Sequence, residues 1–138
     1  MAEFLYDGDC AFCSSCARVL ARLLPGAARI VAWQQADLAA AGLSPAQCDE
    51  SVWWVGRDGT RAAGPVAIGY LLGAVRPGPL APLWRTAGAL LRHRPVRAVA
   101  WPAYRWVARN RHRLPGGTPA CALPHTYGDP VHETPHAP

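Results

Sequence analysis

Three cysteines, each three residues after the last, follow the first apolar stretch of the chain, in the run Tyr6-Asp7-Gly8-Asp9-Cys10-Ala11-Phe12-Cys13-Ser14-Ser15-Cys16. Two thiols at this spacing at the start of a helix are suited to making and breaking disulfides. The N-terminus of a helix carries partial positive charge and free N–H groups, which favour the thiolate, the reactive form of cysteine. This run is therefore the main candidate for a reactive site.

Helix geometry favours Cys10 and Cys13 as the pair that exchanges disulfides. A disulfide needs Cβ atoms about 3.8 Å apart, whereas residues three apart within a regular helix have Cβ atoms about 5–6 Å apart. Cys10 falls at the helix cap, where the backbone is not yet helical, so its side chain can approach Cys13. Cys16 is then an extra thiol one turn deeper. We expect Cys10, nearest the helix dipole and most exposed, to attack the substrate, and Cys13 to resolve the mixed disulfide.

Asp7 and Asp9 stand just before the reactive pair. A carboxylate beside Cys10 disfavours its thiolate and opposes the helix dipole. We therefore expect the pair to work as a reductant. In an alternative interpretation, Asp7 points inward and relays a proton, while Asp9 only caps the following helix.

The same cysteines are also compatible with metal binding. A lone C-x-x-C is often half of a zinc site, which a second C-x-x-C or a His pair completes. Cys48 stands alone, and Cys121 has only His125 nearby; an iron–sulfur cluster would lack its fourth ligand. We predict no metal and no cofactor, and we interpret Cys48 as a small core residue. A non-catalytic module that binds a metal or a partner through these cysteines stays an alternative.

Length and composition favour one folded domain. The chain has 138 residues, of which 51% are hydrophobic, which argues against global disorder. No apolar run approaches the roughly 20 residues of a transmembrane helix, and residues 1–6 do not resemble a signal peptide. We therefore predict a cytoplasmic protein, in which paired cysteines more often do catalysis or bind metal than staple a fold.

The predicted elements follow the order β-α-β-α-β-β-α. Strands are expected at 3–6, 28–33, 52–55 and 60–63, and helices at 12–23, 36–41, from a capping box at 44–47, and from 64 to 72. Asp58-Gly59 fits the hairpin turn between the last two strands. The order resembles a thioredoxin-like α/β domain, with the dithiol at the C-terminal end of the first strand. Reactive groups of open α/β sheets tend to lie at that edge.

A helical extension is expected to complete a domain over residues 1–113. From about residue 79 the sequence predicts helices at 83–92 and 96–113, the second kinked or split at Trp101-Pro102. Residues 114–138 are rich in Pro, Gly and His, and we expect a mobile tail.

The extension is strongly basic, because all fourteen basic residues of the chain are arginines and the net charge is +5. Its arginines alternate with Trp84, Trp101, Tyr104 and Trp106. The pattern is compatible with docking on a membrane surface, a membrane enzyme or nucleic acid. We favour packing of the aromatic rings on the sheet with the arginines in water, and expect no nucleic-acid partner. A further hypothesis brings Arg109 or Arg111 to the dithiol, where it stabilises a thiolate.

The spacing of Asp7, Cys10 and Cys13 resembles the Asp-x-x-Cys-x-x-Cys signature of the DCC family of thiol-disulfide oxidoreductases. Two further segments are similar to that family: Asp58-Gly59 with Gly64-Pro65-Val66-Ala67, and Tyr104-Arg105-Trp106-Val107-Ala108-Arg109-Asn110-Arg111, which resembles its Tyr-x-x-x-Ala-x-x-Arg helix. The resemblance spans residue 3 to about 113. It implies a thioredoxin-like fold and a redox-active Cys10–Cys13 pair. We expect a disulfide-containing protein or small molecule as the substrate, and an unidentified cellular reductant. The chain departs from thioredoxin itself, which has a proline before its third strand, because Asp49-Glu50-Ser51 precedes Val52 here.

Overall fold

The computed structural model describes residues 1–111 and 113. The predicted tail over 114–138, with Cys121 and His125, lies outside these residues. Within the described part of the chain, no helix combines the length and the apolar character needed to cross a bilayer.

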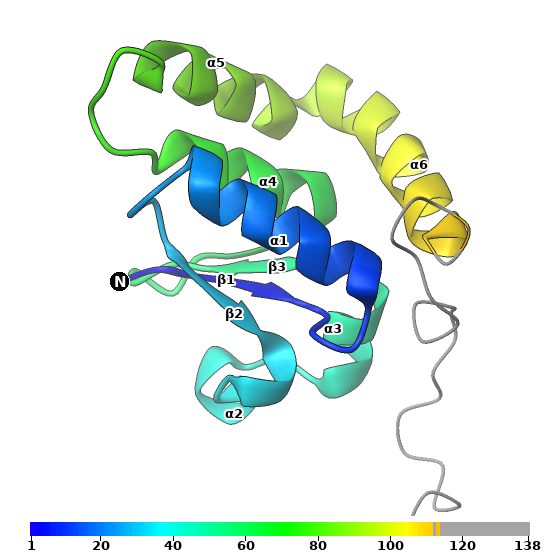
Figure 1. The fold of residues 1–138 in the computed structure, drawn as a ribbon. Coiled ribbons are helices and arrows are strands. Elements are labelled where there is room, and N and C mark those ends of the chain that lie inside the picture. The colour runs from blue at the N-terminus through cyan, green and yellow to red at the C-terminus, as the bar shows by residue number, and fades with distance from the viewer. Residues whose placement is uncertain (112, 114–138) are drawn as a thin grey trace, which may run out of the picture.

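A four-stranded sheet forms the centre of the molecule (Figure 1). Its strands are β1 (Glu3–Tyr6), β2 (Arg29–Ala32), β3 (Trp53–Val55) and β4 (Arg61–Ala63), in the spatial order β2-β1-β3-β4. β1 runs parallel to β2 and antiparallel to β3, and β4 returns antiparallel to β3. The predicted thioredoxin-like α/β architecture is confirmed. β1 is one of the two inner strands, so its C-terminal end lies between β2 and β3.

Helices cover both faces of this sheet. α1 (Ala11–Leu23) and α4 (Gly64–Gly73) pack on one face; the 3₁₀ turn η1 (Trp33–Gln35), α2 (Leu38–Ala41) and α3 (Pro45–Glu50) belong to the other (Figure 1). The predicted capping box opens α3, with the Ser44 hydroxyl accepting from the Gln47 N–H and the Gln47 side chain accepting from the Ser44 N–H. Short apolar strands with helices on both sides therefore give two small cores.

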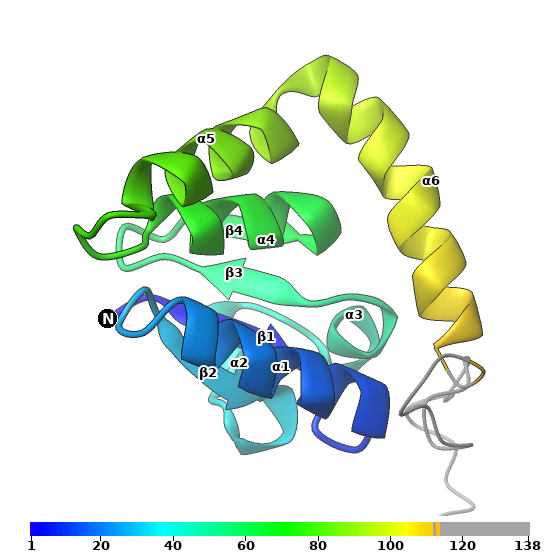
Figure 2. The same ribbon diagram turned by 45° about the horizontal axis from the view of Figure 1, so that its top comes forward.

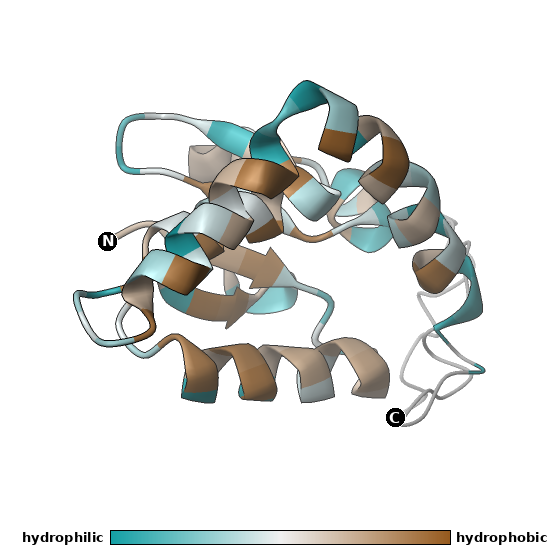
Figure 3. Cartoon of the chain, turned by 90° about the horizontal axis from the view of Figure 1, so that it is seen from above, coloured by the Kyte–Doolittle hydropathy of each residue, from teal (hydrophilic) through white to brown (hydrophobic). Residues whose placement is uncertain are grey.

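The alternation of side chains along β1 divides the two cores. Phe4 packs with Trp54, Leu24 and Leu71 on the α1–α4 side, while Leu5 packs with Trp33, Leu43 and Cys48 on the other. Cys48 is 2% exposed, as expected for a core residue. On α1, the small Ala17 is buried, whereas Val19 and Leu23 are about half exposed. Brown, apolar segments accordingly lie on the helices as well as on the central strands in Figure 3.

The C-terminal helices form a bracket around the α1–α4 layer. α5 (Ala81–Arg92) packs on α4, and α6 (Arg94–Asn110) then turns along the end of the sheet toward the start of α1 (Figure 2). Of the two expectations for Pro102, a kink or a split, the split is wrong, because α6 continues through this residue. Because Pro102 has no N–H, the Ala98 carbonyl has no helical donor. Both residues are exposed, so water can replace that hydrogen bond.

The aromatic residues of the extension have different surroundings. Trp84 packs against the core, whereas Trp106 is 61% exposed, so the expectation that every ring packs on the sheet is wrong for Trp106. Trp101 lies directly over Gly64, whose φ is +57° and where a Cβ would come within 2.7 Å of the indole ring. Glycine is therefore required at this point, and it lets α6 dock on the start of α4.

Candidate functional site

The two cysteines of the motif meet at the first turn of α1. Cys10 is the N-cap, with φ −90° and ψ 118°, and its Sγ accepts a hydrogen bond from the Cys13 N–H at 3.4 Å. The expected non-helical backbone at Cys10 is confirmed. A sulfur at a helix N-cap lies where the dipole and the free N–H groups stabilise negative charge. The residue that caps α1 is thus Cys10 and not Asp9.

Cys10 was expected to be the most exposed cysteine of the motif, and this expectation is wrong. This residue is fully buried at 0% exposure, Cys13 is half-buried, and Cys16 is exposed. The Cys10 side chain folds back over the helix end, and its sulfur is bonded in a disulfide. Cys13 is a free thiol, so Cys10 and Cys13 lie next to each other without being bonded together.

The guanidinium of Arg111 reaches this turn from the end of α6, 98 residues away in sequence. Its Nη1 donates to Cys13 Sγ at 3.4 Å, and its Nη2 lies 3.5 Å from Asp7 Oδ2 and donates to the Asp49 carbonyl at 3.4 Å. Arg111 is 5% exposed and Asp7 4%, so these charges interact away from bulk water, where electrostatic attraction is stronger. A single arginine therefore joins α6, α1, the loop after β1 and the end of α3.

The loop between β1 and α1 is held by Gln34 of η1. The Gln34 amide donates to Asp7 Oδ1 at 2.9 Å and to Asp9 Oδ2 at 3.2 Å, and its Oε1 accepts from the Gly8 N–H at 3.0 Å. Asp7 thus points inward, while Asp9 is exposed and bonded to Gln34. Sequence reasoning missed Gln34. The available signal was its place just after β2, since parallel neighbours end at the same edge of the sheet.

Opposing effects act on the Cys13 thiol. Burial raises its pKa most, the charge and hydrogen bond of Arg111 lower it, and the charge of Asp7 raises it. The net effect is a pKa above the ordinary value, so Cys13 is a thiol at neutral pH in this arrangement. Burial also raises the pKa of Cys16. Arg111 therefore lowers the free energy needed to ionise a thiol that its surroundings otherwise keep neutral.

Tyr104 holds the backbone on the other side of the dithiol. Its hydroxyl oxygen accepts from the Val52 N–H at 2.9 Å, and burial raises the pKa of Tyr104 to about 12. Arg111 holds the Asp49 carbonyl of the same segment. The segment before β3, where thioredoxin has its proline, is thus fixed by two α6 side chains seven residues apart on one helix face. The role of Tyr104 was missed, although its spacing from Arg111 in the motif was visible.

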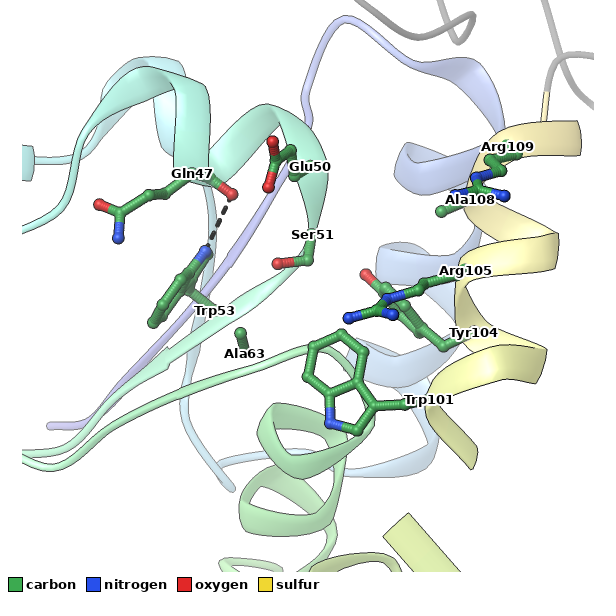
Figure 4. A pocket seen from close by; sticks show the side chains of 10 residues that line it. All are labelled: Gln47, Glu50, Ser51, Trp53, Ala63, Trp101, Tyr104, Arg105, Ala108 and Arg109. Atoms are coloured by element: carbon green, nitrogen blue, oxygen red, sulfur yellow. Dashed lines mark hydrogen bonds between the residues drawn. The ribbon is translucent and has the colours of Figure 1, made fainter. Parts of the chain in front are cut away.

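Arg109 lies apart from the sulfurs. It is exposed and lines a pocket of about 440 Å³ with Glu50, Trp101 and Arg105, on the α3 side of α6 (Figure 4). Residues two apart on a helix point in different directions, which explains why Arg111 reaches Cys13 and Arg109 does not take that place. Among residues 1–111 and 113, no three His, Cys, Asp or Glu side chains gather as a metal site requires.

Comparison with known proteins gives one match. No curated protein and no solved structure matches the chain. The family model of the DCC1-like thiol-disulfide oxidoreductases matches residues 4–117, which include the cysteine motif, all of α6 and the whole sheet except Glu3. The resemblance seen in the cysteine motif thus extends over most of the sequence, and the chain belongs to the DCC1-like thiol-disulfide oxidoreductase family.

Proposed function

We propose that this chain catalyses thiol–disulfide exchange, with Cys10 forming the mixed disulfide with the substrate and Cys13 resolving it. The observation that carries the proposal is the buried Arg111 guanidinium, 3.4 Å from the free Cys13 thiol, whose backbone N–H is in turn 3.4 Å from Cys10 Sγ. Both sulfurs thus lie at one helix N-terminus, and Cys13 has a cation beside it; each of these features stabilises a thiolate.

The exchange proceeds in two balanced steps. The Cys10 thiolate attacks one sulfur of the substrate disulfide, the substrate S–S bond breaks, and the first half leaves as a thiolate that takes a proton from water. Cys13 then loses its proton to solvent, and its thiolate attacks Cys10 Sγ. The mixed disulfide breaks, and the second half leaves in the same way. The products are two substrate thiols and a Cys10–Cys13 disulfide, which a cellular thiol reductant returns to the dithiol.

We infer that the pair acts as a reductant. Burial and the Asp7 charge keep the pKa of Cys13 above its ordinary value despite Arg111. A dithiol whose thiolate form is not strongly stabilised gives up its electrons more readily than one with a very acidic cysteine. The inward position of Asp7, salt-bridged to Arg111, supports this direction.

A turnover assay tests the proposal against the metal-binding alternative. The full chain is purified anaerobically, its bound metal is measured, and reduction of insulin and of a small disulfide is followed. We expect turnover by the wild type and by Cys16→Ser, a matched control at an exposed thiol, and none by Cys10→Ser. Stoichiometric zinc together with turnover that does not depend on Cys10 would defeat the proposal.

A further inference from the structure

An apolar cavity of about 330 Å³ opens directly beside Cys13. It lies between α1, the sheet, α4 and α6, and Cys13, Cys16 and Arg111 form part of its wall. Cavities of small-molecule sites start at about 300 Å³ and combine apolar walls with a few polar groups at one place. The cavity therefore has the size and composition of a small-ligand site, and it adjoins Cys13, the proposed resolving cysteine.

The rest of the wall is almost wholly apolar. α1 contributes Phe12 and Leu20, α4 contributes Ile68, and α6 contributes Ala103 and Val107. The hydroxyl of Tyr104, which also lines the cavity, already accepts the Val52 N–H. Arg111 already lies 3.5 Å from Asp7 Oδ2, and a charged group placed elsewhere in the cavity would lose its hydration without gaining a partner. The walls thus select an uncharged, apolar occupant.

The way α6 is attached explains why the space stays open. Trp101 docks on Gly64 near the middle of α6, and Arg111 docks on Cys13 and Asp7 just past its end. Between these anchors the helix lines the cavity with the small side chains of Ala103, Val107 and Ala108 and with Tyr104, whose hydroxyl is bonded to the Val52 N–H. The two fixed points hold the helix in place, and three of the four side chains between them are too small to fill the space.

We propose that this cavity binds the body of the substrate, and that the substrates are uncharged, apolar small-molecule disulfides. This inference rests on the proposed function and adds its substrate class. The apolar group occupies the space lined by Phe12 and Val107, and the S–S bond lies toward Cys13, whose N–H is 3.4 Å from Cys10 Sγ. Exchange then follows the two steps given above, with the dithiol as electron donor and two apolar thiols as products.

Binding is tested first, with the uncharged fluorescent probe N-phenyl-1-naphthylamine and the full-length protein. The wild type is expected to bind the probe with a rise and blue shift of its emission. Ala103→Phe, which fills the cavity from α6, is expected to weaken binding by about tenfold or more, as the loss of several apolar contacts predicts. Ala98→Phe, at an exposed position on the same helix, is the matched control and should bind like the wild type. Equal binding by both variants would overturn the proposal.

Turnover is tested with two uncharged disulfides, the apolar 4,4′-dipyridyl disulfide and the hydrophilic bis(2-hydroxyethyl) disulfide. We expect Ala103→Phe to lower kcat/KM for the apolar substrate about tenfold relative to kcat/KM for the hydrophilic one, while Ala98→Phe keeps the wild-type ratio of the two values. Circular dichroism of both variants checks that they fold. Val107→Phe fills the same space from the next turn and is expected to repeat the result.

The outcomes separate this inference from the proposed function. If neither variant changes the ratio of the two kcat/KM values while Cys10-dependent turnover persists, the substrate class is wrong and the proposed function stands. If the variants slow insulin reduction only, the occupant is an apolar side chain of a protein substrate, and the small-molecule assignment falls. If no substrate shows Cys10-dependent turnover, the proposed function fails and the substrate class with it, whether or not the probe binds.

Discussion

Replacing Arg111 by methionine removes the cation from Cys13 while keeping an unbranched side chain of similar length. A hydrogen bond to a charged group contributes about 1.5–3 kcal/mol, and a tenfold change in ionisation corresponds to about 1.4 kcal/mol. Since Arg111 lowers the pKa of Cys13 through both charge and hydrogen bond, its loss raises that pKa further and reduces the thiolate about 10- to 100-fold at pH 7. A more basic thiolate is intrinsically more reactive, with a Brønsted coefficient of about 0.5, so the net rate of Cys13 should fall about 3- to 10-fold.

The assay is the rate of alkylation of Cys13 by iodoacetamide, resolved by residue with mass spectrometry. Because Arg111→Met would leave the buried Asp7 carboxylate unpaired, the comparison is made between Asp7→Asn and the Asp7→Asn/Arg111→Met double variant. Asp7→Asn alone should act in the opposite sense and speed alkylation, since the Asp7 charge raises the pKa of Cys13. Arg109→Met is the matched control. The role assigned to Arg111 would be refuted if the double variant were alkylated at the same rate as Asp7→Asn. It would also be refuted if Arg109→Met slowed alkylation as much as the loss of Arg111 does.

Three further results are expected. Tyr104→Phe leaves the Val52 N–H without its acceptor. In urea titrations it should lower the free energy of unfolding by about 1–3 kcal/mol. The control Tyr70→Phe keeps its stack on Trp54 and should not show this loss. Ser44→Ala removes the side-chain acceptor of the capping box and should cost about 1 kcal/mol, whereas Ser44→Asp should keep most of the stability in the same titrations. Burial raises the pKa of Cys48 from 9.0 to about 11. Below pH 9 the thiol is protonated in both the folded and the unfolded chain. Between pH 9 and 11 only the unfolded chain loses the proton. Stability should therefore fall across that window, and Cys48→Ala should show a shallower fall; identical slopes would contradict the assignment.

Local signals in the sequence were enough to predict most of the framework. The Asp58-Gly59 turn, the Ser44 capping box and the apolar strands depend on neighbouring residues, so the hairpin, the start of α3 and the sheet could be read from short segments. The same local rules predicted the N-cap of α1 in part. Sequence reasoning allowed both Asp9 and Cys10 at that position, and the choice depends on Gln34, which binds the Asp9 carboxylate from another strand.

Tertiary packing decided the features that were missed or wrongly predicted. The burial of Cys10, the pairing of Arg111 with Asp7 and the hydroxyl of Tyr104 on Val52 all depend on where α6 returns. That return is set by the docking of α5 on α4 and by contacts such as Trp101 on Gly64, which no local pattern contains. The motif spacing of Tyr104 and Arg111 showed that they share a helix face, but only the fold shows what that face touches.

The central claim, that Cys10 carries the substrate and Cys13 releases it, is tested most directly by trapping. Cys13→Ser is incubated with 4,4′-dipyridyl disulfide and quenched with acid, and the adduct is located by mass spectrometry, with Cys10→Ser and Cys16→Ser treated in parallel. The account predicts a stable mixed disulfide on Cys10 in Cys13→Ser, and none that persists on Cys10 in Cys16→Ser, where Cys13 can still resolve it. A mixed disulfide that accumulates on Cys13 in Cys10→Ser, with no adduct on Cys10 in Cys13→Ser, would contradict it.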